Sequence, residues 1–262
     1  MLVADFNKYL PYVIVLLAVL FVYNVITLVG ISSNVSSAIA DAKVAAMPIE
    51  IEVTFLKADD CDDCRDISSM ITSLEDIFTV EVNEIQYGSS EADELIEKYD
   101  LEFAPTIILS SDASKYDGFE QIWEAYGTQE DDSSFVLRNG VPPYLDTETE
   151  DVLGIVNIIY LVDESCEDCY DVTVHKKILS GFGLALGNEE TVDVNTKEGH
   201  DLLSKYNIRK YPTVILSSDA DEYSILQQVW EQVGEVADDG SYVFTNMDQM
   251  QGAVFVDLDE EQ

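Results

Sequence analysis

Two stretches of this chain share one pattern, an apolar run of strand length that ends in two cysteines spaced CxxC. In the first stretch, β-branched and aromatic residues and then acidic residues lead to Cys61 and Cys64. In the second stretch, a similar run leads to Cys166 and Cys169. These are all four cysteines of the protein. All cysteines therefore belong to two equivalent CxxC pairs, and any prediction of fold and function has to explain these pairs.

The similarity continues after the cysteines and indicates that one domain is duplicated. Residues 98–112 and 205–219 are identical at nine of fifteen positions, including Pro105 and Pro212. The order β-α-β-α-β-β is predicted for both repeats, up to Trp230 in the second, and implies an α/β fold with a mixed sheet flanked by helices. In the first repeat, the hydrophobic periodicity predicts strands at residues 50–56, 79–86, 106–110 and 121–126, and helices at residues 63–76 and 91–99.

The N-terminal segment predicts a membrane anchor. Residues 11–31 contain no charged side chain, and about 20 apolar residues suffice to cross a bilayer as a helix. A cleaved signal peptide is the alternative, supported by Ala38 and Ala40, but the apolar stretch is longer than a usual signal core. We expect an N-terminal tail at residues 1–10, a transmembrane helix at 11–31, a tether at 32–48, and two domains at 49–146 and 147–262.

The charge balance argues against nucleic-acid binding. The 262 residues include 13 Lys and Arg against 52 Asp and Glu, which gives a net charge of −39, and such a field repels nucleic acid and anionic lipid surfaces. The acidic residues are spread along the whole folded part, which favours a halophilic surface, adapted to molar salt. A low-affinity cation reservoir and an acidic face for a partner protein are the alternatives.

The spacing of the cysteines suits dithiol exchange. A CxxC that begins a helix directly after a strand places its first sulfur at the positive end of the helix dipole, where a thiolate is stabilised. This favours Cys61 and Cys166 as nucleophiles. Cys64 and Cys169, one turn further on, are then close enough to resolve a mixed disulfide.

The two prolines precede buried strands and are candidates for cis peptide bonds. A proline at a strand start does not donate to the ladder, so the backbone before Pro105 and Pro212 is free to pair with an extended substrate. Ala104 and Tyr211 are therefore predicted substrate contacts together with the prolines. An ordinary strand boundary is the simpler interpretation of a proline at this position.

Each repeat resembles a thioredoxin-fold domain, through its strand, CxxC and helix followed by a proline-threonine strand. The resemblance covers residues 49–127 and 154–234, and the tandem layout is similar to that of archaeal protein disulfide oxidoreductases and protein disulfide isomerases. It implies dithiol–disulfide exchange, with the first cysteine of each pair as nucleophile, the second as resolving thiol and the cis-proline loop as substrate contact.

The repeats depart from that family pattern at three points. Asp60 and Ser165 stand where a tryptophan is common before the first cysteine. Phe55 and Tyr160 stand where many thioredoxins have a buried acid. The last helix of the fold is not visible in the periodicity. The second departure leaves open which group takes the proton from the resolving thiol.

Acidic residues surround both pairs and disfavour a thiolate. In ~1 M salt the Debye length falls to about 3 Å, which screens most of this effect. Lys57 and Arg65 add positive charge in the first repeat, whereas the second has Val162 and Tyr170 at these positions. If one pair dominates, we expect it to be that of the first repeat.

Three other residues are expected to be structural. His175 follows the last cysteine by six residues, which places it on a different helix face, so it is expected to pack or face solvent rather than act as a base or ligand. Trp123 and Trp230 are expected to be core residues in corresponding strands.

The sequence thus favours a membrane-anchored thiol–disulfide oxidoreductase or isomerase whose partners are the thiols and disulfides of exported proteins. Its domains are expected on the extracytoplasmic side, where paired thiols persist as disulfides. We expect no cofactor and no metal; a membrane redox partner and the direction of electron flow are left open.

Two other functions compete with the oxidoreductase. In the first, the protein is a membrane-anchored binding or scaffold module whose CxxC disulfides are staples. In the second, all four cysteines form one metal site. That site would require two separate domains to bring their cysteines into contact at tetrahedral distances.

Overall fold

The structure, a computed structural model, describes residues 49–247, 250 and 252–259. The predicted anchor at residues 11–31 and the tether lie outside these residues. Within the part of the chain that is described, no helix is long and apolar enough to cross a membrane. The anchor therefore stays a prediction.

The two repeats form sheets of identical topology. In the first repeat the strand order is β2-β1-β4-β6-β5, and only the β1–β2 pair is parallel. In the second, the order is β10-β9-β12-β14-β13, with β9 and β10 parallel. The strands of the first sheet are β1 (Glu50–Lys57), β2 (Thr79–Gln86), β4 (Thr106–Leu109), β5 (Gly127–Gln129) and β6 (Phe135–Leu137). Those of the second are β9 (Ile155–Val162), β10 (Ala185–Asp193), β12 (Thr213–Leu216), β13 (Gly234–Val236) and β14 (Tyr242–Phe244).

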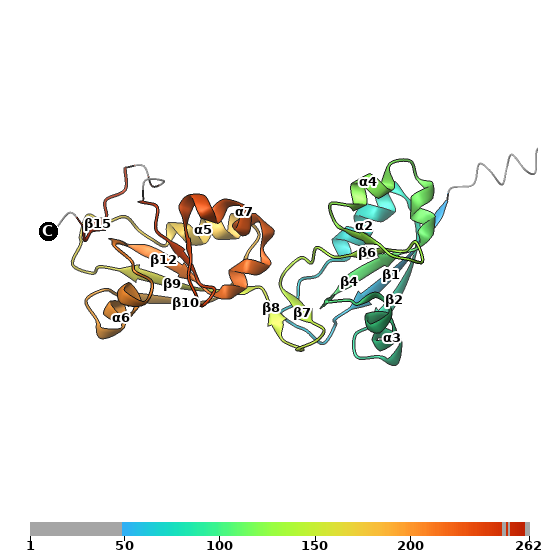
Figure 1. Cartoon of the computed structure of the whole chain (residues 1–262), viewed down its shortest axis with the longest axis horizontal. Helices are drawn as coiled ribbons and strands as arrows, with labels where there is room; N and C mark the ends of the chain where they lie inside the picture. The colour runs from blue at the N-terminus through green and yellow to red at the C-terminus, as the bar shows by residue number, and fades with distance from the viewer. Residues whose placement is uncertain (1–48, 248–249, 251, 260–262) are drawn as a thin grey trace, which may run out of the picture. The chain divides into compact units, whose positions relative to one another are not determined.

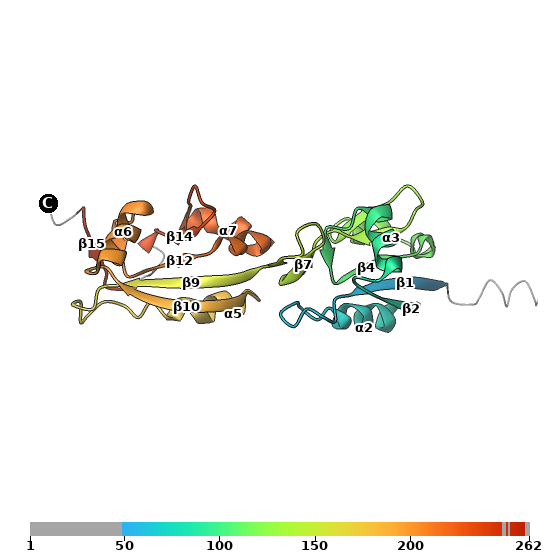
Figure 2. The ribbon, with the colours of Figure 1, turned by 90° about the horizontal axis from the view of Figure 1, so that it is seen from below.

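Helices cover both faces of each sheet. Figure 1 shows α2 and α4 on one side of the first sheet and α3 on the other, and α5 and α7 opposite α6 in the second. Figure 2 shows the same separation of α2 from α3 and of α5 from α6. The bounds are α2 (Ser68–Ile77), α3 (Ser90–Tyr99), α4 (Phe119–Trp123), α5 (Val174–Gly181), α6 (Lys197–Lys205) and α7 (Ser224–Val233), with short 3-10 helices η1 (Ser111–Lys115) and η2 (Ser218–Glu222). The mixed α/β architecture with flanking helices is as predicted.

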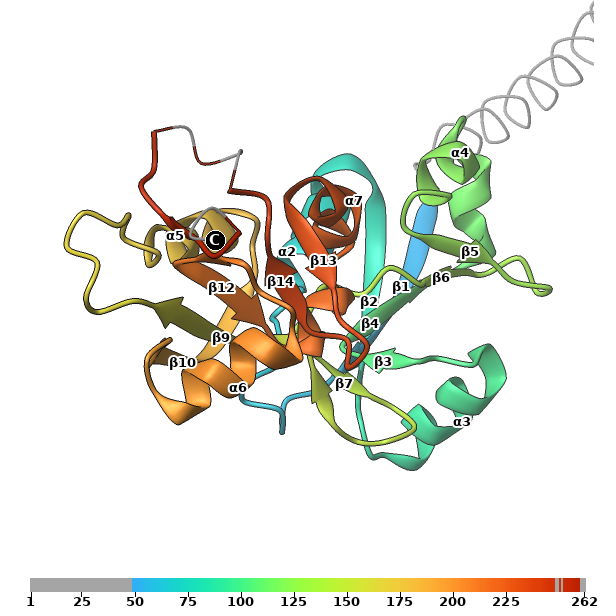
Figure 3. The same cartoon turned by 60° about the vertical axis from the view of Figure 1, so that its left-hand side comes forward.

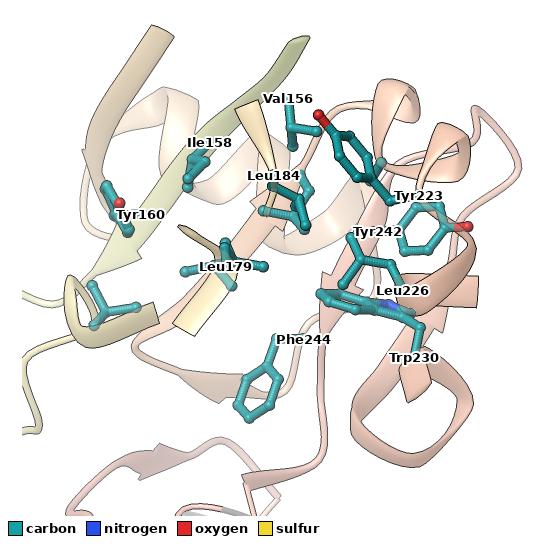
Figure 4. Packing of buried hydrophobic residues seen from close by; sticks show 14 of the residues in the cluster. Val156, Ile158, Tyr160, Leu179, Leu184, Tyr223, Leu226, Trp230, Tyr242 and Phe244 are labelled. Carbon is teal, nitrogen blue, oxygen red and sulfur yellow. The ribbon is translucent and has the colours of Figure 1, made fainter. Parts of the chain in front are cut away.

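Successive side chains of a strand point to opposite faces of the sheet, so one sheet contributes to two hydrophobic cores. Val156, Ile158 and Tyr160 alternate along β9 and pack with Leu179 of α5 in one cluster. Figure 4 shows these side chains together with those of α7 and β14. Leu161, one residue out of phase, belongs to the cluster on the α6 side.

Two small sheets complete the fold. In the first repeat, β3 (Phe103–Ala104) pairs with β7 (Tyr144–Asp146), which in turn pairs with β8 (Val152–Leu153). In the second, β11 (Lys210–Tyr211) pairs with β15 (Val256–Asp257). Figure 3 shows β7 lying beside β3.

The helix after each cysteine pair begins later than predicted. We expected it to begin at residue 63, but α2 begins at Ser68. The carboxylate of Asp66 accepts a hydrogen bond from the Ser68 amide at 2.8 Å, and Asp171 accepts one from the Thr173 amide at 2.9 Å before α5 begins. Aspartates that bond the backbone two residues on compete with the helix. The prediction that CxxC lies in the first helical turn is therefore wrong.

The predicted strand at residues 121–126 is also wrong, because residues 121–123 lie in α4 and residues 124–126 form a turn, and the counterpart segment lies in α7. Phe119 and Trp123 are both buried, as are Leu226 and Trp230. Each pair is spaced by four residues, which is the period of a helix face. The prediction that both tryptophans are core residues is confirmed, although they lie in helices.

Neighbouring residues of α5 provide a matched test of the core. Leu179 is 4% exposed and Ile178 is 47% exposed. Leu179→Ala should lower the free energy of unfolding by about 2–5 kcal/mol, because it removes buried contacts and leaves a cavity. Ile178→Ala should cost less than about 1 kcal/mol. Denaturant unfolding of both variants at constant high salt measures the difference, and equal costs would contradict the packing of this helix.

Candidate functional site

The strand register brings each proline to its cysteine pair. β1 leads into the loop that carries the first pair, and Thr106, the residue after Pro105, lies opposite Leu56 of that strand. The second repeat has the same register, with Thr213 opposite Leu161. A central strand and its antiparallel neighbour therefore fix the distance between the CxxC loop and the proline.

Both predicted cis peptide bonds are present. The bonds Ala104–Pro105 and Tyr211–Pro212 are cis, as expected from their place before buried strands. A third cis bond, Pro142–Pro143, was not anticipated from the sequence. The roles of the four predicted substrate-contact residues stay predictions.

Each cysteine pair forms a disulfide within its own repeat. The Cα atoms of Cys61 and Cys64 are 5.3 Å apart, and those of Cys166 and Cys169 are 5.5 Å apart. The structure therefore describes the oxidised state of both pairs, in which the four sulfurs do not act together as ligands. Among the residues described, no group of three or more His, Cys, Asp or Glu side chains is placed to hold a metal ion.

A cavity of about 390 Å³ opens beside the first pair. It is lined by Cys61, Cys64 and Pro105, and also by Lys57 and Glu84. The predicted nucleophile, the predicted resolving thiol and the cis-proline thus border one space. A partner disulfide or dithiol has room to approach the sulfurs here.

Lys57 supplies the positive charge of this cavity. Its ammonium nitrogen lies 3.2 Å from a carboxylate oxygen of Asp59 and 3.3 Å from one of Glu84. The hydrogen bond to Asp59, followed by that to Glu84, raises the pKa of Lys57. In the reduced protein, an ammonium group beside a cysteine favours the thiolate, while the two carboxylates oppose it.

Arg65 has a structural role that was not expected from the sequence. Its guanidinium Nε donates to the carbonyl of Pro142, and its backbone amide donates to the carbonyl of Pro143 at 2.7 Å. The side chain borders the cavity, but its hydrogen bonds hold a neighbouring backbone segment. The expectation that Arg65 offsets the acidic charge around the first pair stays a prediction.

The position of the missing buried acid is filled differently in the two repeats. Phe55 is buried in the core of the first. In the second, the Tyr160 hydroxyl donates to the Glu189 carboxylate at 3.0 Å, and burial, followed by this bond, raises the pKa of Tyr160 to about 12. Glu84 lies opposite Phe55 on the adjacent strand β2. A carboxylate therefore reaches the first cavity from the neighbouring strand, a placement visible only once the register is known.

The half-buried Tyr170, which follows the second disulfide, and the buried His175 form a polar pair. The Tyr170 hydroxyl donates to the carbonyl of Pro212 at 2.9 Å and lies 3.3 Å from His175 Nε2. The His175 ring lies 4.7 Å from that of Phe244, between centroids, and is 7% exposed. Of the two expected placements of His175, packing rather than solvent exposure is therefore observed.

The backbone edges before both prolines are already paired. Ala104 lies opposite Leu145 of β7, and Tyr211 lies opposite Val256 of β15. These partner strands were not predicted from the sequence, because they are too short to show a periodic pattern. The signal that could have found them is short: an aromatic residue, an aliphatic residue and an aspartate occur in succession at 144–146 and at 255–257.

No known protein family and no curated protein matches this chain. Among the solved structures that resemble it is a cysteine-to-alanine mutant of AhpF, a component of the alkylhydroperoxide reductase of Enterococcus faecalis, with 17% identity, a TM-score of 0.22, and coverage of 66% of this chain and 84% of that chain. The NTD_N/C domain of AhpF from the same organism has 16% identity, a TM-score of 0.21 and the same coverage. A structure of ERdj5 has 11% identity and a TM-score of 0.19, and the match covers 68% of this chain and 25% of that chain.

The topology of the chain itself, a mixed sheet flanked by helices in each repeat and two CxxC disulfides, is consistent with a thioredoxin-like fold.

Protonation of His175 should destabilise the protein at acid pH. Desolvation lowers the pKa of His175 from 6.5 to about 4. The unfolded chain therefore binds this proton at a higher pH than the folded chain does, so the contribution to stability is complete above pH 6.5 and is lost as the pH falls through about 4. The loss is on the order of 3 kcal/mol.

The measurement is the free energy of unfolding of wild type and of His175→Gln between pH 7 and pH 4, at constant salt. Glutamine has no proton to gain, while the carboxylates that titrate nearby are common to both proteins. Wild type should lose more stability than the variant as the pH falls. A difference between the two that does not change with pH would contradict a neutral, buried histidine.

Proposed function

We propose that this protein is a membrane-anchored thiol–disulfide oxidoreductase that acts on exported proteins and uses Cys61–Cys64 as its principal pair. The single observation that supports this most strongly is the cavity in which both cysteines of the first repeat border the cis-proline Pro105. A disulfide that only stabilises the fold does not require a cavity beside its sulfur atoms. The apolar segment at residues 11–31 supports the anchor.

The chemistry follows from the pair of sulfurs. In the reduced protein, the Cys61 thiolate attacks one sulfur of a substrate disulfide, and the other substrate sulfur leaves as a thiolate that takes a proton from solvent. The thiol of Cys64 then loses its proton and attacks the Cys61 sulfur. This forms the Cys61–Cys64 disulfide and releases the second substrate thiolate, so the substrate gains the two electrons that the pair loses. The reverse sequence oxidises a substrate dithiol.

Glu84 is the group proposed to receive the proton of Cys64. It lines the same cavity and is held by Lys57 at 3.3 Å. The second repeat has Thr191 at the register position opposite Tyr160 and Val162 at the position of Lys57. It therefore has neither a carboxylate nor an ammonium at these two positions, which supports the first pair as the principal one.

The acidic surface fits a protein that works in concentrated salt. With 13 basic and 52 acidic residues, the ammonium groups are too few to neutralise the field at the cysteines. At ~1 M salt the Debye length is about 3 Å, so screening removes most of the electrostatic penalty on forming a thiolate. The halophilic character of the protein is part of this proposal.

A non-catalytic binding module is the second candidate. Two observations favour it: the buried-acid positions hold Phe55 and Tyr160, and the edges before the prolines are paired within the chain. In this alternative the disulfides stabilise the CxxC loops, which lack helical structure, and a partner binds elsewhere.

Trapping distinguishes the two candidates. Cys64→Ala should accumulate a mixed disulfide between Cys61 and an exported protein, because nothing resolves it, whereas Cys169→Ala should accumulate less. The measurement is non-reducing electrophoresis and mass spectrometry of the full-length chain isolated from its own membranes. A double variant without Cys61 and Cys64 is the control. No trapped partner on either cysteine would favour the binding module.

The charge of Lys57 should set the reactivity of the first thiol. In reduced Cys64→Ala protein, the added change Lys57→Met should raise the pKa of Cys61 by about half a unit or more, because two carboxylates remain without their ammonium partner. Lys115→Met, which removes an exposed lysine paired with Asp112, is the matched control. Alkylation rates against pH at low and molar salt measure the effect, and equal pKa values in both variants would contradict it.

A further inference from the structure

Residues 142–147 and 253–258 form two segments with one residue pattern, and we name them the covering segments. Each contains a short strand, β7 in the first repeat and β15 in the second. An aromatic residue, an aliphatic residue and an aspartate follow one another in both. The duplication thus provides two independent examples of the same arrangement.

Each covering segment occupies the backbone edge that precedes a cis-proline. Ala104 lies opposite Leu145, and Tyr211 lies opposite Val256, in antiparallel pairs. An exposed strand edge beside a reactive group is a site where an extended peptide adds as a further strand. In this protein a strand of the same chain holds that edge, in both repeats.

The covering segments are also bound at the cysteine loops. The amide of Arg65, the residue after the first pair, donates to the carbonyl of Pro143 at 2.7 Å. The amide of Tyr170, the residue after the second pair, donates to the carbonyl of Val254 at 3.0 Å. Each segment therefore runs from the CxxC loop to the strand before the cis-proline, across the path that a partner polypeptide would take.

Hydrogen bonds at the far end complete the contact. The Thr147 amide donates to the carbonyl of Glu102 at 3.0 Å, and the Leu258 amide donates to the carbonyl of Arg209 at 2.9 Å. These four residues lie at equivalent places in the two repeats. The contact is thus built mainly from backbone groups, which any extended polypeptide also has.

Side chains add selectivity to this backbone pairing. The ring of Tyr144 lies 5.0 Å from that of Phe103, between centroids. In the second repeat, Phe255 packs against the core cluster under α5 and α7, and Asp257 forms an ion pair with Lys210 at 3.3 Å. The edge therefore accepts an aromatic side chain, and in the second repeat it also has a lysine for the acid.

The pairing is short enough to be exchanged. Each covering strand makes two residue pairs with the strand before the cis-proline, compared with eight between β1 and β2. A peptide that replaces the segment forms the same kind of backbone hydrogen bonds that it breaks, so the net change in hydrogen bonding is small. The covering segment keeps one advantage, the high effective concentration that its covalent connection gives it.

We propose that the covering segments are internal occupants of the peptide-binding edges, and that an extended polypeptide with aromatic, aliphatic and acidic residues in succession displaces them. The proposal rests on the proposed function in taking the edge beside each cysteine pair as the substrate site. Small disulfides do not need this edge and reach the cavity without displacement. The covering segments thus select for polypeptides of this residue pattern.

Binding of a peptide copy tests the proposal without requiring catalysis. The probe is a fluorescein-labelled peptide, Gly-Pro-Tyr-Leu-Asp-Thr-Gly, titrated with full-length oxidised protein and followed by anisotropy. Thr147→Pro removes the amide that bonds Glu102, whereas Thr147→Val keeps it, so the two variants form a matched pair. Thr147→Pro should bind the peptide at least tenfold more tightly than Thr147→Val. Equal affinities in the two variants would overturn the proposal.

Hydrogen exchange of the wild-type protein gives a second readout that does not depend on how a variant folds. The amides of Arg65, Thr147, Tyr170 and Leu258 should exchange at least tenfold faster than those in the centres of β1 and β9, because the covering segments open without global unfolding. Exchange at the same rate as the central strands would overturn the proposal. Peptide binding without any trapped mixed disulfide would support the covering segments while contradicting the proposed function.

Discussion

The antiparallel pairing of β1 with β4, and of β9 with β12, is the constraint on which both candidate sites depend. The first strand of each pair delivers the cysteine loop, and the second begins directly after the cis-proline. A shift of this register by one residue would turn every side chain of the strand to the opposite face. β1 and β9 each contribute buried side chains from both faces to two separate clusters. Packing in these cores therefore fixes the register, and the register fixes the position of the proline relative to the cysteine pair. The geometry of both candidate sites therefore depends on core packing.

The sequence predicted what depends on short-range patterns and missed what depends on contacts between distant segments. The strands at Glu50–Lys57 and Thr79–Gln86 could be predicted because their apolar runs and alternation are local. The delayed start of α2 could not be predicted in this way. It depends on two hydrogen bonds, from the Ser68 amide to the Asp66 carboxylate and from the Arg65 amide to the carbonyl of Pro143. Glu84 was missed for a related reason: an acid in an alternating strand indicates an exposed face, and only the register with Phe55 brings it to the cysteine pair. The covering strands, of two or three residues, are too short for any periodic signal.

Duplication has kept the scaffold and changed the chemistry around the sulfurs. Both repeats retain the disulfide, the cis-proline and the covering segment. The first surrounds its pair with an ammonium and carboxylates at a cavity, whereas in the second the residue after the pair is Tyr170, whose hydroxyl contacts His175 and the carbonyl of Pro212. Neither CxxC lies in the first turn of a helix, so helix-dipole stabilisation of a thiolate is reduced in both. Differences in reactivity between the pairs should then come from side-chain charge and from access past the covering segments, both of which respond to salt or to a competing polypeptide.

The central claim, that the first CxxC exchanges electrons with protein partners, is tested most directly by the reduction potential of each disulfide in the full-length chain at molar salt. Equilibration with a glutathione or dithiothreitol redox buffer, read by mass shift after alkylation, reports the two pairs separately through Cys166→Ser/Cys169→Ser and Cys61→Ser/Cys64→Ser double variants. Exchange activity predicts a potential for Cys61–Cys64 between about −270 and −120 mV, within the span of known dithiol oxidoreductases. A potential below about −300 mV would contradict it, because disulfides that stable act as structural links.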